Sequence, residues 1–279
     1  MTERMIETDD VRLCVETFGD PGDPPVLLVM GMAGSMLWWD EGFCRALADG
    51  GRFVVRYDHR DTGRSTTYEP GRPGYDGDDL LADIGRVLDG LGLDAAHLVG
   101  VSMGGGLSQD FALEHPGRVR SLVLMSTSPV VAGGDLPGIA DEYGAFLAQP
   151  APDPDDTDAV ATHVVAETRV LAGGRRPFDE AYMRALIARD MARADRYASA
   201  GNHARIAGGE ASRHDLAEIA APTLVIHGTA DPLFPVEHGV ALTDGIPGAR
   251  LVTIDDAGHG LEPADHALVA RAILEHTAA

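Results

Sequence analysis

The sequence contains no lysine. All 22 basic residues are arginine, and they stand against 44 acidic residues, so the formal net charge is −22. A surface this acidic does not neutralise phosphate groups, so we expect neither nucleic acid nor an anionic membrane surface as a partner. We expect a small-molecule partner instead.

Cysteine is scarce, and metal-binding patterns are missing. Only Cys14 and Cys44 occur, and neither belongs to a C-x-x-C pair, which excludes a disulfide framework. We expect both to be small buried apolar residues. Histidine is more frequent, with 11 residues, but none shows H-x-x-x-H or H-E-x-x-H spacing. We therefore expect no metal and no cofactor.

Long hydrophobic runs are also missing. No apolar stretch approaches the roughly 20 residues that a membrane helix needs. The first seven residues are acidic and lack the basic region and apolar core of a secretory signal. We expect a cytoplasmic protein, and the length of 279 residues suits one large domain that acts as a monomer or a homodimer.

What the sequence does contain is an alternation of short apolar runs with helical patterns. Continuous apolar runs are typical of parallel strands covered on both faces, so the pattern predicts an α/β fold with a doubly wound, mostly parallel sheet. The expected strands are 11–17, 26–30, 53–57, 97–101, 121–125, 223–227 and 250–254, and the expected helices lie near 38–49, 78–91, 103–115, 236–245 and 262–276.

One segment interrupts this alternation. From about 133 to 209 there is no convincing strand, and the pattern indicates three helices near 137–148, 157–172 and 178–198. We predict an α/β core formed by 1–132 and 210–279, with 133–209 inserted as an all-helical cap over the site. The alternative is a peripheral helical decoration.

The most informative motif is Gly100-Val101-Ser102-Met103-Gly104, which lies between an expected strand and an expected helix. G-x-S-x-G in this setting indicates a nucleophile elbow, a strained turn that presents a serine above the sheet. Glycine is needed at both ends because a Cβ there would collide with the neighbouring strand or helix. Ser102 is therefore the candidate nucleophile.

A serine nucleophile requires a base, an acid that orients the base, and donors for the oxyanion. Asp231 follows the strand 223–227 in a loop with two prolines, and His259 follows the last strand between two glycines. Both loops are expected at the carboxyl edge of the sheet, where ligands bind. Asp231 is the candidate acid and His259 the candidate base, although an Asp-Pro turn or a solvated loop histidine would look the same in isolation.

The oxyanion hole should consist of two backbone N–H groups. We assign one to Met103, the residue after the nucleophile, and the other to Met32 in the loop after the strand 26–30. Gly31 and Trp39 are the candidate substrate contacts. Trp38 is a second pocket candidate, and we expect one of the two indoles to belong to the core.

With these motifs in order, the chain resembles an α/β-hydrolase-fold serine hydrolase over essentially its whole length. Within that family it most resembles the aclacinomycin methylesterase type, with the closest similarity in 19–21, 27–31, 47–51 and 56–67. Many relatives carry a histidine where Met30 stands, so the support of the oxyanion loop must differ here. We expect the charged side chains of segment 58–65 to pair with each other and with backbone groups, and so to brace the loop under the site.

The resemblance implies a cofactor-free hydrolase that cleaves a carboxylic ester of a small, largely apolar molecule, such as a polyketide methyl ester, through an acyl-enzyme. The same triad also serves C–C bond hydrolases, lactonases and perhydrolases. Epoxide hydrolases and haloalkane dehalogenases are disfavoured because their chemistry needs a carboxylate where Ser102 stands. A ligand-binding protein without turnover is the remaining alternative.

Overall fold

The computed structural model describes residues 3–8, 11–131, 135–154, 156–206 and 214–278, and its centre is an eight-stranded sheet. The strands lie side by side in the order β1-β2-β4-β3-β5-β6-β7-β8. All neighbours from β4 to β8 pair in parallel, while β2 pairs antiparallel with β1 and β4. The bounds are β1 Arg4–Glu7, β2 Arg12–Phe18, β3 Pro25–Val29, β4 Phe53–Tyr57, β5 Ala96–Val101, β6 Val119–Met125, β7 Thr223–Gly228 and β8 Arg250–Ile254.

The apolar runs of the inner strands fill two cores at once. In β3, Leu27 and Val29 face one hydrophobic cluster, whereas Val26 and Leu28 face the other. Successive strand residues point to opposite faces, so a strand that is covered on both sides must be apolar throughout. The predicted doubly wound, mostly parallel sheet is confirmed.

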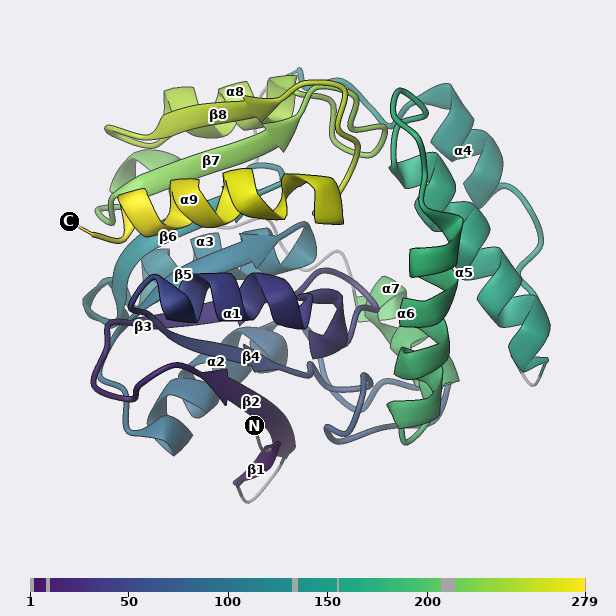
Figure 1. Ribbon diagram of the computed structural model, residues 1–279, viewed down its shortest axis with the longest axis horizontal. Helices are drawn as coiled ribbons and strands as arrows, with labels where there is room; N and C mark the ends of the chain where they lie inside the picture. The colour runs from purple at the N-terminus through teal and green to yellow at the C-terminus, as the bar shows by residue number, and fades with distance from the viewer. Residues whose placement is uncertain (1–2, 9–10, 132–134, 155, 207–213, 279) are drawn as a thin grey trace.

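Helices form the two outer layers. The apolar faces of α1 (Glu41–Asp49) and α9 (His266–His276) pack on one side of the sheet, and α2 (Gly77–Leu91), α3 (Met103–Glu114) and α8 (Glu237–Gly245) pack on the other. Figure 1 shows α1 and α9 in front of the strands. Cys14 and Cys44 are fully buried free thiols, as expected.

The strand β1 was not predicted. It is short, lies at the edge of the sheet, and buries only the side chain of Ile6. A four-residue edge strand with one buried side chain has no apolar run to reveal it. The antiparallel β1–β2 pair therefore became visible only in the structure.

In its described residues, the segment between β6 and β7 consists of helices joined by loops: α4 Asp141–Leu147, α5 Thr157–Leu171, α6 Glu180–Arg193 and a short α7 His203–Ile206. Figure 1 shows α4 to α6 beside the sheet, beyond the loops that follow β7 and β8. The expected domain boundaries, 132/133 and 209/210, lie outside the described residues. No helix among the described residues has the length and apolar character to cross a bilayer.

We predict acid destabilisation from three buried histidines. Burial lowers the pKa of His59, His97 and His203 from 6.5 to about 4. Because the folded-state pKa is depressed, their contribution to stability is complete above pH 6.5 and is lost as the pH falls to about 4. Each histidine should contribute a slope of about 1.4 kcal/mol per pH unit in that window.

Urea unfolding at a series of pH values measures this slope. His97→Gln should reduce the slope by about 1.4 kcal/mol per pH unit, since it removes one histidine with a lowered pKa. A free energy of unfolding that stays constant between pH 6.5 and 4 would contradict the prediction.

Candidate active site

Ser102 stands at the junction of β5 and α3 in a strained backbone conformation, with φ 54° and ψ −121°. Positive φ is costly for a residue with a side chain, so the surroundings must hold it there. Its N–H donates to the Met125 carbonyl at 2.9 Å, and its carbonyl accepts from the N–H of Gly105 at 2.9 Å, from that of Gly106 at 3.1 Å and from the Thr127 hydroxyl at 2.8 Å. These four bonds fix the turn.

The two glycines of the elbow are required by close approach. A Cβ on Gly100 would lie 2.3 Å from the Gly104 carbonyl oxygen, and a Cβ on Gly104 would lie 2.2 Å from the Val29 carbonyl oxygen. Both separations are far below a van der Waals contact. The predicted reason for glycine at these positions is confirmed.

Two free backbone donors lie beside the serine. A Cβ built on Gly31 would be 3.2 Å from the Ser102 Cβ, so the loop after β3 lies against the serine side chain. In the described part of the chain, the N–H groups of Met32 and Met103 donate to no protein acceptor. Met103 also begins α3, where the helix dipole favours negative charge. This arrangement suits a developing oxyanion.

Asp231 and His259 come together at the same edge of the sheet. The Nδ1 of His259 lies 2.9 Å from Oδ2 of Asp231, while Oδ1 of Asp231 accepts the N–H groups of Leu233 and Phe234, each at 2.9 Å. With Nδ1–H donated to the carboxylate, Nε2 of the ring is the nitrogen that can accept a proton. A buried acid thus orients a partly exposed imidazole.

The carboxylate stays ionised despite its burial. Burial by itself raises the pKa of Asp231, but the adjacent His259 and the Phe234 N–H outweigh it, so the pKa lies below its ordinary value. A second histidine, His227, is fully buried with Nε2 3.6 Å from the same carboxylate, and it donates to the Phe234 carbonyl at 2.7 Å. His227 thus supports the loop that carries Asp231.

The loop after β6 joins the serine to the histidine. Thr127 binds the Ser102 carbonyl through its hydroxyl, and the Ser126 hydroxyl accepts the Gly260 N–H at 3.3 Å. Among the described residues, the Ser102 hydroxyl itself makes no hydrogen bond. In ligand-free enzymes, the hydrogen bond between a serine nucleophile and its base often forms only when substrate binds. Sequence reasoning missed Ser126 and Thr127, although their place directly after β6 was a usable signal.

The segment 58–65 braces the oxyanion loop, mostly through partners outside itself. Asp58 accepts the Met36 N–H at 2.9 Å, and the His59 Nε2 lies 2.9 Å from the Met30 carbonyl. Arg60 forms a buried ion pair with Asp83 at 2.8 Å. The expected bracing role agrees with these contacts. The expected pairing of the charged side chains with each other is wrong, because their ion-pair partners lie in other elements.

The two indoles separate into a core residue and a half-buried one. Trp39 is 1% exposed and stacks on Phe43 inside the core. Trp38 is partly exposed, and its Nε1 donates to Asp190 of α6 at 2.9 Å. Of the two, Trp38 is therefore the one with surface near the helical segment.

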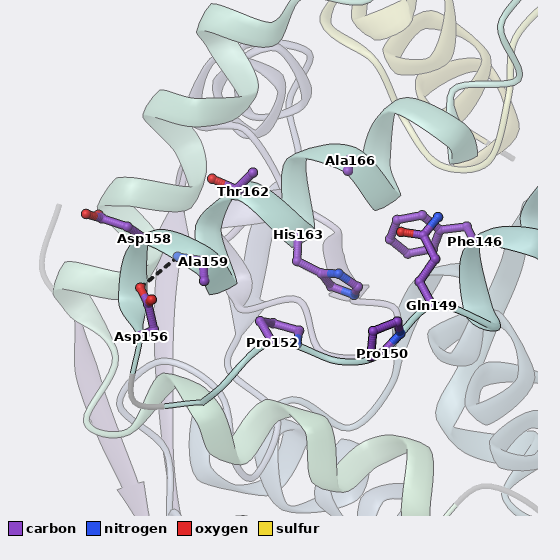
Figure 2. Close-up of a pocket in the computed structure, with 10 residues that line it drawn as sticks. All are labelled: Phe146, Gln149, Pro150, Pro152, Asp156, Asp158, Ala159, Thr162, His163 and Ala166. Carbon is purple, nitrogen blue, oxygen red and sulfur yellow. Dashed lines mark hydrogen bonds between the residues drawn. The ribbon is translucent and has the colours of Figure 1, made fainter.

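A separate cavity of about 600 Å³ lies in the helical segment, between the α4–α5 connection and α5. Figure 2 shows Pro150 and Pro152 of the connection facing His163 of α5. It contains none of the predicted site residues, and its lining consists of Phe146, Gln149, Pro150, Pro152, Asp156, Asp158, Ala159, Thr162, His163 and Ala166. Among the described residues, no group of three or more His, Cys, Asp or Glu side chains is arranged to hold a metal ion.

The helical segment is hydrogen-bonded to the loop that carries Asp231 and to the loop that carries His259. The His259 N–H donates to the Leu171 carbonyl at the end of α5, at 2.7 Å. The Ala140 N–H, just before α4, donates to the Pro232 carbonyl, also at 2.7 Å. The segment is thus part of the framework of this edge.

Comparison with known proteins places these features in a family. The pattern of the α/β hydrolase fold matches residues 24–261. The chain is 36% identical to rhodomycin D methylesterase DauP of Streptomyces sp. strain C5 and to rhodomycin D methylesterase DnrP of Streptomyces peucetius, covering 100% of this chain and 99% of each relative.

Solved structures show the same fold. An esterase from Exiguobacterium antarcticum superimposes with a TM-score of 0.79 at 22% identity, covering 100% of both chains. A meta-cleavage product hydrolase from Pseudomonas fluorescens gives 0.77 at 20% identity, covering 99% of this chain and 97% of that one. The topology, the elbow and the two methylesterase relatives agree, and the chain belongs to the α/β hydrolase fold family.

Proposed function

We propose that this protein is a cofactor-free serine esterase. The family and the full-length methylesterase relatives support an esterase-type hydrolase. The observation that carries the proposal is the strained Ser102 between two unoccupied backbone donors, at the same sheet edge as the Asp231–His259 pair.

The proposed mechanism is acyl transfer through the serine. Ser102 Oγ attacks the ester carbonyl carbon while Nε2 of His259 takes the hydroxyl proton, and Asp231 stabilises the imidazolium through Nδ1–H. The N–H groups of Met32 and Met103 bind the oxyanion. The same proton then goes to the departing alcohol, leaving an acyl-enzyme that water hydrolyses by the reverse sequence of proton transfers.

The proposed substrate class is a methyl ester of a carboxylic acid on a small, largely apolar molecule. The relatives are named for the methylesterase reaction on rhodomycin D, and they match this chain from end to end. We propose that 133–209 acts as a cap that selects the substrate, since Leu171 at the end of α5 and Ala140 just before α4 contact the loops that carry His259 and Asp231. Gly31 is the proposed backbone contact to the substrate.

The cellular location and the oligomeric state are also proposals. The two cysteines are buried free thiols. Free thiols are typical of proteins from reducing compartments, which supports a cytoplasmic location. We propose that the enzyme works there as a monomer or a homodimer. The net charge of −22 supports a small-molecule substrate in preference to nucleic acid.

The second candidate is a C–C bond hydrolase, lactonase or perhydrolase that uses the same residues. The fold is shared with both an esterase and a meta-cleavage product hydrolase, so fold alone does not choose between them. A panel of methyl esters, lactones and vinylogous diketones distinguishes these activities by relative kcat/KM.

Ser102→Ala should abolish turnover of p-nitrophenyl acetate and labelling by a fluorophosphonate. The substitution removes the attacking oxygen, so we expect a loss of about 10⁵-fold or more in kcat. Turnover is followed by the absorbance of the released p-nitrophenolate at about 400 nm. Labelling is followed by intact mass spectrometry. Wild-type turnover by the alanine variant would overturn the mechanism.

His259→Ala should also lose labelling, because the hydroxyl then has no base. His115 is exposed at the end of α3, so His115→Ala is a matched control expected to label like the wild type. A ligand-binding protein without turnover would label poorly in all forms, wild type included.

Asp231→Asn should lower kcat by about 10⁴-fold with the fold intact. The amide oxygen still accepts the Leu233 and Phe234 N–H groups, but the negative charge beside Nδ1 is gone. Asp255 is exposed near the same edge, so Asp255→Asn serves as the control. Steady-state kinetics, with circular dichroism to check folding, makes the comparison, and equal kcat values for the two variants would argue against Asp231 as the acid.

A further inference from the structure

The loop that carries Met32 is not held by the Met32 side chain. That side chain is 44% exposed, so packing contributes little to the position of its backbone. The next residue, Ala33, has φ 62°, a left-handed conformation that costs about 1–2 kcal/mol for a residue with a Cβ. Something outside the loop must keep this backbone in place.

His203 is the side chain that contacts it. This residue begins α7 in the helical segment and is completely buried. Its Nδ1 lies 2.9 Å from the Ala33 nitrogen, and its Nε2 lies 2.8 Å from the Arg60 carbonyl oxygen. Both ring nitrogens are therefore used, one toward the oxyanion loop and one toward the segment that braces it.

These two contacts define the tautomer of the ring. The Ala33 nitrogen is a donor, so Nδ1 must be the bare nitrogen that accepts, and Nε2 must carry the hydrogen that goes to Arg60. Burial and the neighbouring His59 lower the pKa of His203 to about 4, which keeps the ring neutral near pH 7. The edge contacts of its ring with His59 and Tyr75 hold its orientation.

The loop is thus held on both sides of Met32. Before it, the Met30 carbonyl receives a hydrogen bond from His59, and after it, the Ala33 N–H is held by His203. Within the described ranges of the chain, the Met32 N–H between them has no protein acceptor. An N–H fixed by its neighbours and left unpaired is preorganised to bind a charge that develops in the transition state.

We propose that His203 is a positioning residue for the oxyanion hole, by which the helical segment helps to stabilise the transition state. The inference rests on the proposed serine mechanism. His203 does not touch the substrate; it aligns the Met32 peptide by accepting the Ala33 N–H. Loss of that bond misaligns one of the two oxyanion donors, and small misplacements of catalytic groups cost about 10- to 100-fold in rate.

Two substitutions at His203 test the hydrogen bonds of the two ring nitrogens separately. In His203→Asn the amide oxygen occupies the place of Nδ1 and still accepts the Ala33 N–H, but the Arg60 contact is lost. In His203→Gln the amide nitrogen reaches the place of Nε2 and still donates to Arg60, but the Ala33 contact is lost. We expect kcat within about 3-fold of the wild type for Asn and 10- to 100-fold lower for Gln, with KM little changed in both.

A transition-state analogue distinguishes positioning from a merely structural role. Ser102 Oγ adds to the carbonyl carbon of a trifluoromethyl ketone, the C=O becomes an alkoxide, and the proton passes to His259. Its Ki should rise in proportion to the fall in kcat/KM across the variants, whereas the Ki of the product carboxylic acid should not change. His276 is a buried histidine on α9 that contacts the Leu122 carbonyl at 3.0 Å, so His276→Gln is the control: lower stability, unchanged kcat and Ki.

A backbone ester at Ala33 provides a second test if His203→Gln does not fold. Replacing Ala33 by L-lactate exchanges its N–H donor for an ester oxygen and leaves His203 in place, and we expect the same 10- to 100-fold loss in kcat. Wild-type kcat and ketone Ki in the Gln or the lactate variant would overturn the role of His203, as would a loss in the Asn variant equal to that in Gln. An inactive wild type, or an active Ser102→Ala, would instead overturn the serine mechanism.

Discussion

The approach of the α3 N-terminus to β3 and β5 is the constraint on which the proposed catalytic edge depends. Gly104 lies so close to the Val29 carbonyl that a Cβ would be 2.2 Å from its oxygen, and this contact forces the sharp turn at Ser102. The turn aims the serine out of the sheet and places the free Met103 N–H beside it. The positive φ of Ser102 is tolerable because four hydrogen bonds hold its peptide groups.

The helical segment contributes to this edge as a framework element. It forms hydrogen bonds with the Pro232 carbonyl of the acid loop, with the His259 N–H of the base loop and with the Ala33 N–H of the oxyanion loop. The Arg176 side chain adds a hydrogen bond to the Asp255 carbonyl of the base loop. Two ion pairs add to the attachment: Arg193 of α6 contacts the buried Asp58 at 2.7 Å and the partly exposed Glu3 at 2.7 Å. A lid that swung away as a rigid unit would break contacts to all three loops together, so the geometry favours access to the site without separation of the segment from the core.

Sequence patterns predicted the fold and the grouping of Asp231 with His259 because both depend on local signals. Each lies in a loop directly after an apolar strand, and parallel strands bring such loops to one edge. The role of His203 had no such signal. It is one histidine in a short helix, and its partner Ala33 is 170 positions away, so only the three-dimensional structure relates them. The burial of Trp39 rather than Trp38 was equally hidden, because adjacent indoles have the same local pattern.

Two attachments of the helical segment to the acid and base loops are made by backbone groups alone, whereas the Arg176 side chain also contacts the Asp255 carbonyl in the base loop. Leu171 offers only its carbonyl and Ala140 only its N–H, so almost any residue could serve at either position, proline at 140 excepted. The strict requirement is for glycine at position 258 of the core, because a Cβ there would lie 2.2 Å from the Leu171 oxygen. Side chains of the segment that make no contact with the core can therefore change without loss of these two backbone attachments.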